Sequence, residues 1–293
     1  MPTLKEIRTR INTVTSTRQT TSAMKMVSAA KLHKAQDRLL RLRPYKSAMQ
    51  GIIARIAPRT ADTTGYTAAR EPQRVLIVVI TSDKGLCGAL NSNTVKHAFH
   101  IAETTYRAQW EQGQVTFMAF GEKGRALLRK RHVPMLEDLP DFNDHFDSRF
   151  TAPIAERLMQ AFERGEADHI VFVYHRFKNA ATQEVADERF LPMLPETWRT
   201  ADDATMSEDD YIYEPDRNTM LEYLLPGMLR LQCYCAFCEA AASEHGSRMT
   251  AMHQATDNAD KLIEELSLQY NKARQAAITN QLVEIVSSTE AQR

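Results

Sequence analysis

Near the C-terminus, over residues 248–290, apolar or small residues recur at alternating steps of three and four. This spacing is typical of a helix with one narrow apolar stripe, and the segment contains neither Pro nor Gly. Because a core-facing helix usually has a wider apolar face, the stripe indicates packing against a single partner helix. Its members are Met249, Met252, Thr256, Ala259, Ile263, Leu266, Tyr270, Ala273 and Ala277.

The same spacing at the other end of the chain predicts a first long helix over residues 3–57. Its stripe is apolar at both ends but polar in the middle, at Arg18, Thr21, Lys25 and Ser28. Pro44 lies inside the pattern, which predicts a kink or a local break near Arg43. The apolar ends comprise Leu4, Ile7, Ile11 and Val14, then Leu32, Ala35, Leu39, Leu42, Met49, Ile53 and Ile56, with Lys46 interrupting the second set.

Between the two helices the pattern changes to strands alternating with helices, which predicts a small α/β layer domain over residues 72–200. The run 74–80, aliphatic from Val75 onward, is typical of a strand buried on both faces of a parallel sheet. Further strands are expected at 114–120 and 169–174, with an edge strand at 183–192. Helices are expected at 89–110, 122–131 and 150–164, a mobile link at 60–67, irregular structure at 133–147 and a surface loop at 202–210.

The expected fold is therefore α/β: a central Rossmann-like layer domain plus a long antiparallel coiled coil of the N- and C-terminal helices. The coiled-coil segments are residues 1–58 and 218–293, and the second helix begins either near Asn218 or at Pro226. From residue 226 to 290 the helix would be about 100 Å long, at about 1.5 Å per residue. A globule of this mass has a radius of gyration of only about 19 Å, so we expect both helices to project and to pair with each other.

The chain has 293 residues, of which 43% are apolar and 25% are charged, and this composition is typical of soluble folded proteins. The longest apolar run, 75–80, is far shorter than a membrane span, and the N-terminus lacks the apolar core of a signal peptide. Four cysteines in such a chain indicate free thiols. Cys233, Cys235 and Cys238 suggest half of a zinc site, but on a helix Cys233 points away from Cys235, which favours small apolar helix residues.

Charge is unevenly distributed, although the whole chain balances 37 basic against 37 acidic residues. The first sixty residues contain thirteen Lys or Arg against only Glu6 and Asp37, a net charge of +11. One interpretation is a nucleic-acid-binding helix lying along phosphates. That helix lacks aromatic residues for base stacking apart from Tyr45, and its charges spread around it, so this interpretation is the less favoured one.

Candidate catalytic chemistry is sparse. The loop 82–88 follows the first strand, where α/β domains bind phosphates, but it matches neither a phosphate loop nor a dinucleotide turn. Cys87 could be a nucleophile, yet no histidine is near it in sequence, and His97 with His100 lacks a carboxylate at ligand spacing. We therefore expect no catalysis, cofactor or metal. The alternative is an α/β enzyme whose long helices serve as dimerising arms, but the sequence lacks the catalytic residues that such an enzyme needs.

Four separated motifs make the chain resemble the gamma subunit of the F-type ATP synthase over nearly its whole length. They are Ala-Met-Lys-Met-Val-Ser-Ala-Ala-Lys-Leu at 23–32, Thr-Ser-Asp-Lys-Gly-Leu-Cys-Gly-Ala-Leu-Asn at 81–91, Tyr-Glu-Pro at 213–215, and the run 248–286. The resemblance implies a non-catalytic central-stalk rotor that couples proton flow to ATP synthesis or hydrolysis. It implies alpha, beta and epsilon subunits and the c-subunit ring as partners. It also implies a peripheral location at the cytoplasmic face of the inner membrane, with no nucleic acid and membrane contact only through partners.

The resemblance also implies roles for individual residues. Rotor–stator contacts facing the beta subunits are expected at Lys25, Arg248, Arg274, Gln275 and Thr279, and the contacts with epsilon and the c-ring at Tyr211 and Glu214. The four on the second helix could equally be ordinary solvated helix residues, and the polar stretch that contains Lys25 could be a break that fixes the register of the helix pair. The chain departs from the family at Gln281, where a glutamate is frequent, and in its polar tail 287–293.

Overall fold

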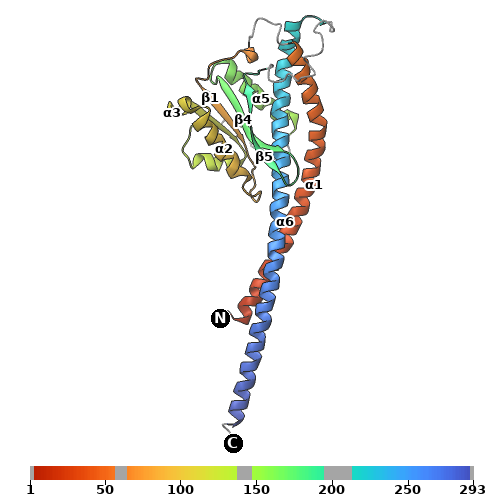
Figure 1. Ribbon diagram of the computed structural model, residues 1–293, viewed down its shortest axis with the longest axis vertical. Coiled ribbons are helices and arrows are strands. Elements are labelled where there is room, and N and C mark those ends of the chain that lie inside the picture. Colours follow the sequence, from red (N-terminus) through yellow and green to blue (C-terminus); the bar gives the residue numbers. More distant parts are fainter. Residues whose placement is uncertain (1–2, 57–64, 137–146, 195–212, 291–293) are drawn as a thin grey trace. The chain divides into compact units, whose positions relative to one another are not determined.

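The computed structural model describes residues 3–56, 65–136, 147–194 and 213–290, with only the backbone at 284 and 286–290 (Figure 1). Most of the expected link, the acidic segment 202–210 and Tyr211 therefore lie outside the described residues. The helices are α1 (Leu4–Ile56), the 3₁₀ turn η2 (Gly65–Thr67), α2 (Leu90–Thr104), α3 (Arg107–Glu111), α4 (Glu122–Arg129), α5 (Ser148–Glu163) and α6 (Arg217–Glu290). The strands are β1 (Val75–Ile80), β2 (Val115–Phe120), β3 (Met135–Leu136), β4 (His169–Phe177) and β5 (Gln183–Leu191).

The chain packs as two units, and the two long helices contribute to both. The paired-helix unit consists of residues 1–29 and 248–293, and the α/β unit consists of residues 30–247. The α/β unit thus contains the second part of α1, the sheet with its helices, and the first part of α6. The predicted fold class, a Rossmann-like layer domain with long antiparallel terminal helices, is confirmed.

A five-stranded sheet forms the centre of the α/β unit, in the order β3-β2-β1-β4-β5. β1 is parallel to both β2 and β4, β3 is parallel to β2, and β5 pairs antiparallel to β4 at the edge. Every residue of β1 is buried, as its unbroken aliphatic sequence predicted for a central strand. The run predicted as an edge strand is indeed at the edge, and its mixed burial fits one open side.

Both faces of the sheet are covered. Successive strand residues point to opposite faces, so each face has its own set of apolar side chains that pack against helices. On one face Ile77 and Val79 join Phe99 of α2 and Phe117 in a buried cluster. On the other face Phe120 packs against Phe237 of α6, with ring centroids 4.9 Å apart. α6 is therefore part of the core of the α/β unit.

α1 is continuous through Pro44, so the local break expected near Arg43 does not occur. Proline removes one backbone hydrogen bond, but buried residues hold the helix on both sides of it. Leu39 before Pro44 and Ile53 after it are 3% and 0% exposed, so packing outweighs the local preference.

α6 begins at Arg217, the earlier of the two expected starts, and continues through Pro226. Asp216 decides the start because its carboxylate accepts hydrogen bonds from the backbone N and Oγ1 of Thr219, at 3.0 and 2.7 Å. Satisfying a free N–H group in this way is what an N-terminal cap does.

Two local predictions were wrong. The helix expected over residues 89–110 is two helices, because Tyr106 leaves the helical conformation and donates its buried hydroxyl to His169 Nδ1 at 3.1 Å. The His169 ring donates from Nε2 to the carbonyl of Arg70, which leaves Nδ1 as the acceptor. The segment expected to be irregular, 133–147, contains the short strand β3, which pairs with Phe117 and Met118.

His175 of β4 should make the fold sensitive to acid. Its ring is 5% exposed, and Nδ1 lies 2.9 Å from Thr94 Oγ1, whose own hydrogen goes to the carbonyl of Leu90. Nδ1 is therefore the donor. Burial lowers the pKa of His175 to about 4 from the ordinary 6.5. Below pH 6.5 the unfolded chain binds a proton that the folded chain does not, so the free energy of unfolding falls as pH drops towards 4.

His175 should lower the free energy of unfolding by about 3 kcal/mol between pH 7 and pH 4. Urea unfolding of the wild type and of His175→Asn, whose amide can still donate to Thr94, measures it. The wild type should be the more stable of the two at pH 7 and should lose most of that advantage at pH 4. A difference between the two proteins that does not change with pH would show that His175 is not responsible.

Candidate functional site: the paired helices and the end of α6

The two helices of the paired-helix unit run antiparallel and contact each other through the predicted stripes. Nearly every predicted stripe position in this unit is buried or half-buried, and Arg18 is the exception. The Arg18 side chain is 45% exposed, and its partner Asp260 is 51% exposed, so the pair contributes little stability. Three polar contacts define the register: Lys25 Nζ to His253 Nδ1 at 3.3 Å, Thr21 Oγ1 to Thr256 Oγ1 at 2.9 Å, and Arg18 Nε to Asp260 Oδ1 at 2.6 Å.

α6 extends past the start of α1 (Figure 1). The residue numbers of each contact pair add up to 277 or 278, so Leu4, the first residue of α1, lies level with about residue 274. Beyond that level the chain supplies no second helix among its described residues. Large apolar side chains are exposed there: Ile278 (49%), Leu282 (57%), Val283 (61%) and Ile285 (60%).

Three of the predicted contact residues lie on this part of α6. Arg274, Gln275 and Thr279 are all exposed, and the hydroxyl of Thr279 donates to the carbonyl of Gln275 at 2.9 Å. At about 100° per residue, they fall on one side of the helix together with Ile278 and Leu282. We call residues 274, 275, 278, 279, 282 and 285 the α6 end face. An exposed face that mixes apolar and hydrogen-bonding groups is typical of a protein contact.

The other two predicted contact residues differ in exposure. Arg248 is only 8% exposed, which sequence periodicity did not indicate. Lys25 is half-buried, and its ammonium group lies beside the ring of His253, which in turn lies 3.4 Å from the carboxylate of Asp257. Lys25 therefore places a positive charge at the polar break in the α1 stripe.

Of the two residues expected to contact epsilon and the c-ring, Tyr211 lies outside the described residues. Glu214 is exposed, and its peptide bond to Pro215 is cis. Beside it the guanidinium of Arg217 lies over the ring of Tyr213, 4.5 Å from its centroid. This cation–π contact connects the Tyr-Glu-Pro motif to the first turn of α6.

Polar groups of the loop after β1 are hydrogen-bonded within the loop, to Asn91 of α2 and, at Asp83 Oδ1, to the backbone N of Glu122 at 3.0 Å. Asn91 Oδ1 accepts from the backbone N of Ser82 at 3.0 Å, and Asn91 Nδ2 donates to Ser82 Oγ at 2.7 Å and to Cys87 Sγ at 3.3 Å. The Ser82 hydroxyl donates to the carbonyl of Lys84. Leu86, with φ +66°, is 60% exposed at the tip. These contacts favour the predicted tight turn.

All four cysteines are free, as predicted, and all four are buried. Burial raises the pKa of Cys235 to about 11 and that of Cys238 to about 12, and it raises the pKa of Cys233 further. Thiols with such pKa values are poor nucleophiles near neutral pH. Among the described residues, no group of three His, Cys, Asp or Glu side chains is arranged to hold a metal ion.

Sequence reasoning missed a charged cluster in the α/β unit, formed by Arg43 and Lys46 of α1 with Glu188 of β5 and Glu239 of α6. The one available signal was Lys46, a lysine at a stripe position that is otherwise apolar. No helix within the described ranges is long and apolar enough to cross a membrane.

Comparisons with known proteins agree over the whole chain. A family model described as ATP synthase matches residues 3–292. The ATP synthase gamma chain of Flavobacterium johnsoniae is 46% identical over 294 residues, and that of Cytophaga hutchinsonii is 42% identical over 293 residues. Each alignment covers 99% of this chain and 99% of the relative.

Solved structures show the same fold. The central stalk and c-ring structure of the Tetrahymena thermophila mitochondrial ATP synthase contains a chain with a TM-score of 0.57 and 25% identity, covering 80% of this chain and 98% of that one. A chain of the Euglena gracilis mitochondrial ATP synthase, at 21% identity, has a TM-score of 0.67 and covers 99% of this chain and 94% of that one. The full-length family match and the identity to its members show that the chain belongs to the ATP synthase gamma-chain family.

Proposed function

We propose that this chain is the central-stalk rotor subunit of an F-type ATP synthase. In this role it couples proton flow through the membrane sector to ATP synthesis or hydrolysis in other subunits. The observation that carries the proposal is the paired-helix unit, in which α6 continues past α1 and exposes the α6 end face. A helix that exposes four large apolar residues needs another protein around it. Membership of the gamma-chain family supports the same role.

The proposed partners are those that the resemblance to the gamma-subunit family implies for the matching residues. Lys25, Arg274, Gln275 and Thr279 face the alpha and beta subunits, which surround the helix pair. Arg248, the fifth residue that the resemblance implies, is only 8% exposed and offers little surface for such a contact. Tyr211 and Glu214 contact epsilon and the c-ring. The complex then holds this chain at the cytoplasmic face of the inner membrane, and the chain touches the membrane only through its partners.

The proposed mechanism is a population shift. A shaft without threefold symmetry presents a different surface to each of three otherwise identical catalytic sites, and so favours a different conformation in each. The asymmetry is available in the paired-helix unit, because one helix ends while the other continues. Rotation of the shaft moves these preferences from site to site. A ligand or contact can shift an equilibrium only by its difference in affinity for the two states, so the contact residues set the strength of coupling.

We propose that the chain itself catalyses no step. Many α/β domains bind phosphate at the loop after β1. Here Ser82 and Cys87 of that loop are hydrogen-bonded to Asn91. Burial raises the pKa of Cys233, Cys235 and Cys238, so these three thiols carry little thiolate. These observations support a structural role for both features.

Co-purification tests the proposed function directly. The tagged chain, expressed together with the other subunits, should retain alpha, beta and epsilon through purification, and removal of residues 275–293 should weaken retention of alpha and beta. The competing hypothesis is that the basic N-terminal helix binds nucleic acid. In that case the chain should bind DNA with strong salt dependence. DNA binding without retained subunits would overturn the proposal.

Lys25→Met should separate ATP turnover from proton pumping. The substitution keeps an unbranched side chain at a half-buried stripe position but removes the ammonium beside His253. An assembled complex should still hydrolyse ATP, because the reacting groups lie in other chains, while protons pumped per ATP should fall because the coupling between shaft angle and site conformation changes. Turnover and proton uptake in inverted membrane vesicles measure both quantities.

Lys34→Met is the matched control, since Lys34 is exposed on α1 and lies off the stripe. It should leave the ratio of protons to ATP unchanged. If turnover disappears in a fully assembled Lys25→Met complex, or if both activities fall in strict proportion, Lys25 has no separate role in coupling.

A further inference from the structure

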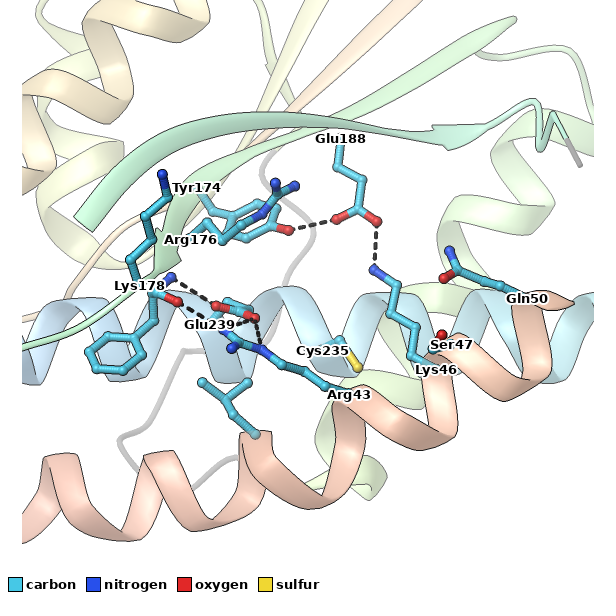
Figure 2. A pocket seen from close by; sticks show the side chains of 12 residues that line it. Arg43, Lys46, Ser47, Gln50, Tyr174, Arg176, Lys178, Glu188, Cys235 and Glu239 are labelled. Carbon is cyan, nitrogen blue, oxygen red and sulfur yellow. Dashed lines mark hydrogen bonds and ion pairs between the residues drawn. The ribbon is translucent and has the colours of Figure 1, made fainter. Parts of the chain in front are cut away.

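A cavity of about 460 Å³ lies within the α/β unit, between α1, β4, β5 and α6 (Figure 2). This volume is in the range of small-molecule sites. Its walls are mostly polar, and cations outnumber carboxylates by four to two. The charged lining residues are Arg43, Lys46, Arg176, Lys178, Glu188 and Glu239.

Glu188 is fully engaged with groups of the protein. Its Oε1 accepts from Lys46 Nζ at 2.7 Å and from Gln232 Nε2 at 3.1 Å, and its Oε2 accepts from the Tyr174 hydroxyl at 2.6 Å. Burial alone would raise the pKa of Glu188, but Lys46 and Tyr174 together lower it below the ordinary value. The carboxylate is therefore charged at neutral pH and balances one cation.

Glu239 is engaged to the same extent. Its Oε1 accepts from Nε and Nη2 of Arg43 at 3.1 and 2.9 Å, and its Oε2 accepts from the backbone N of Phe177 at 2.8 Å. Arg43 Nη2 also donates to the carbonyl of Phe177 at 2.8 Å. Glu239 is bonded directly to Arg43 and Glu188 to Lys46, and Arg176 adds a third cation that interacts with the same two carboxylates without forming an ion pair, so positive charge is in excess.

Several donors in the cavity remain unused by carboxylates. Arg176 is exposed and makes no ion pair among the described residues; its guanidinium interacts with the Tyr174 hydroxyl and, electrostatically, with Glu188 and Glu239. Within the same described part of the chain, the Ser47 hydroxyl and the Gln50 amide make no hydrogen bond. Ser47 and Gln50 share one helix face with Arg43 and Lys46, and Figure 2 shows them on the α1 wall. Lys178 pairs with Glu184 outside the lining.

We propose that this cavity binds a small phosphoryl anion, with Arg176 as the principal ligand and Lys46, Ser47 and Gln50 as further donors. An anion supplies the negative charge that the lining lacks, and a tetrahedral phosphate has enough oxygens to accept from both walls. Arginine suits this role because its guanidinium presents a planar fork of donors. The site holds the phosphate group and no nucleotide base, because the aromatic rings of its wall, Tyr174 and Phe177, are only 2% and 6% exposed.

Calorimetric titration of the full-length chain with inorganic pyrophosphate, at constant ionic strength, tests the proposal. Saturable binding of one ion per chain is expected. Arg176→Gln should weaken it about tenfold or more, because it removes a charged hydrogen bond without disturbing either ion pair. Ser47→Ala should weaken it by about threefold. The control is Arg107→Gln, which removes the same charge from a side chain 75% exposed on α3 and should leave the affinity unchanged.

The outcomes against the proposal are distinct. Absence of saturable binding at millimolar pyrophosphate overturns it. Equal weakening by Arg176→Gln and Arg107→Gln also overturns it, because the net charge of the chain would then be responsible. ATP should bind no more tightly than inorganic tripolyphosphate; much tighter ATP binding would mean that a base is recognised, which this cavity does not do. If Arg176→Gln fails to fold by circular dichroism, Ser47→Ala decides, and an unchanged affinity in that variant rejects the site.

Discussion

Replacing Gly121 with alanine should lower the free energy of unfolding by about 4 kcal/mol, through backbone strain and a steric clash. Gly121 follows β2 with φ +88°, a conformation that other residues rarely adopt. A Cβ atom there would lie 2.3 Å from the carbonyl oxygen of Thr81 and 2.6 Å from its carbonyl carbon. No real contact of this kind is that short, so the backbone would have to move.

The backbone of Thr81 is held in place by its own hydrogen bonds. Its N–H donates to the carbonyl of Phe120 at 2.9 Å, and its hydroxyl donates to the same carbonyl at 2.8 Å. The hydroxyl also accepts from the backbone N of Gly124 at 2.9 Å. Relief of the clash would therefore disrupt contacts at the ends of the adjacent strands β1 and β2.

Gly113→Ala is the matched control for strain without the clash. Gly113 has φ +71°, but nothing lies within 4 Å of the position its Cβ would take. The expected cost is about 1 kcal/mol. Chemical denaturation of the two variants measures the difference. Equal losses would mean that the contact with Thr81 does not matter.

Replacing Leu266 with proline should lower helix stability by about 3 kcal/mol or more and prevent assembly of the complex. Leu266 is half-buried in the predicted stripe of α6, and it lines a groove of the paired-helix unit together with Val14 and Thr13 of α1. Proline removes a backbone donor and its ring clashes with the preceding turn, so the helix would kink and its stripe would leave the register with α1. Circular dichroism on heating and the yield of co-purified alpha and beta subunits measure the two effects.

Leu266→Ala is the control, because it removes most of the same side chain but keeps the backbone hydrogen bond. Since the position is only half-buried, the expected cost is about 1 kcal/mol, below the range for fully buried leucines. This variant should assemble with a modest loss. If the proline and alanine variants assembled in equal yield, continuity of α6 would not be needed for the proposed shaft.

Local periodicity was sufficient to predict most of the secondary structure and the helix pairing. Apart from Arg18, the stripes on the two long helices are buried or half-buried where the alternating steps of three and four placed them, because one face of a helix must meet its partner. The aliphatic run of β1 indicated a central strand for a similar reason, since only a strand covered on both faces can be apolar throughout. Three exposed residues of the α6 end face, Arg274, Gln275 and Thr279, were also candidates from the sequence, through a resemblance of motifs.

Tertiary contacts decided the features that periodicity missed. Packing at Leu39 and Ile53 keeps α1 continuous through Pro44, and the hydrogen bond between Tyr106 and His169 ends α2 early. The cavity is the clearest case. Arg43 meets Glu239 across 196 positions of sequence, and Lys46 meets Glu188 across 142. The residue types along the chain determined which helices and strands form and which faces are apolar. Only the packing of the folded chain decided which charges meet, because partners so distant in sequence leave no local pattern.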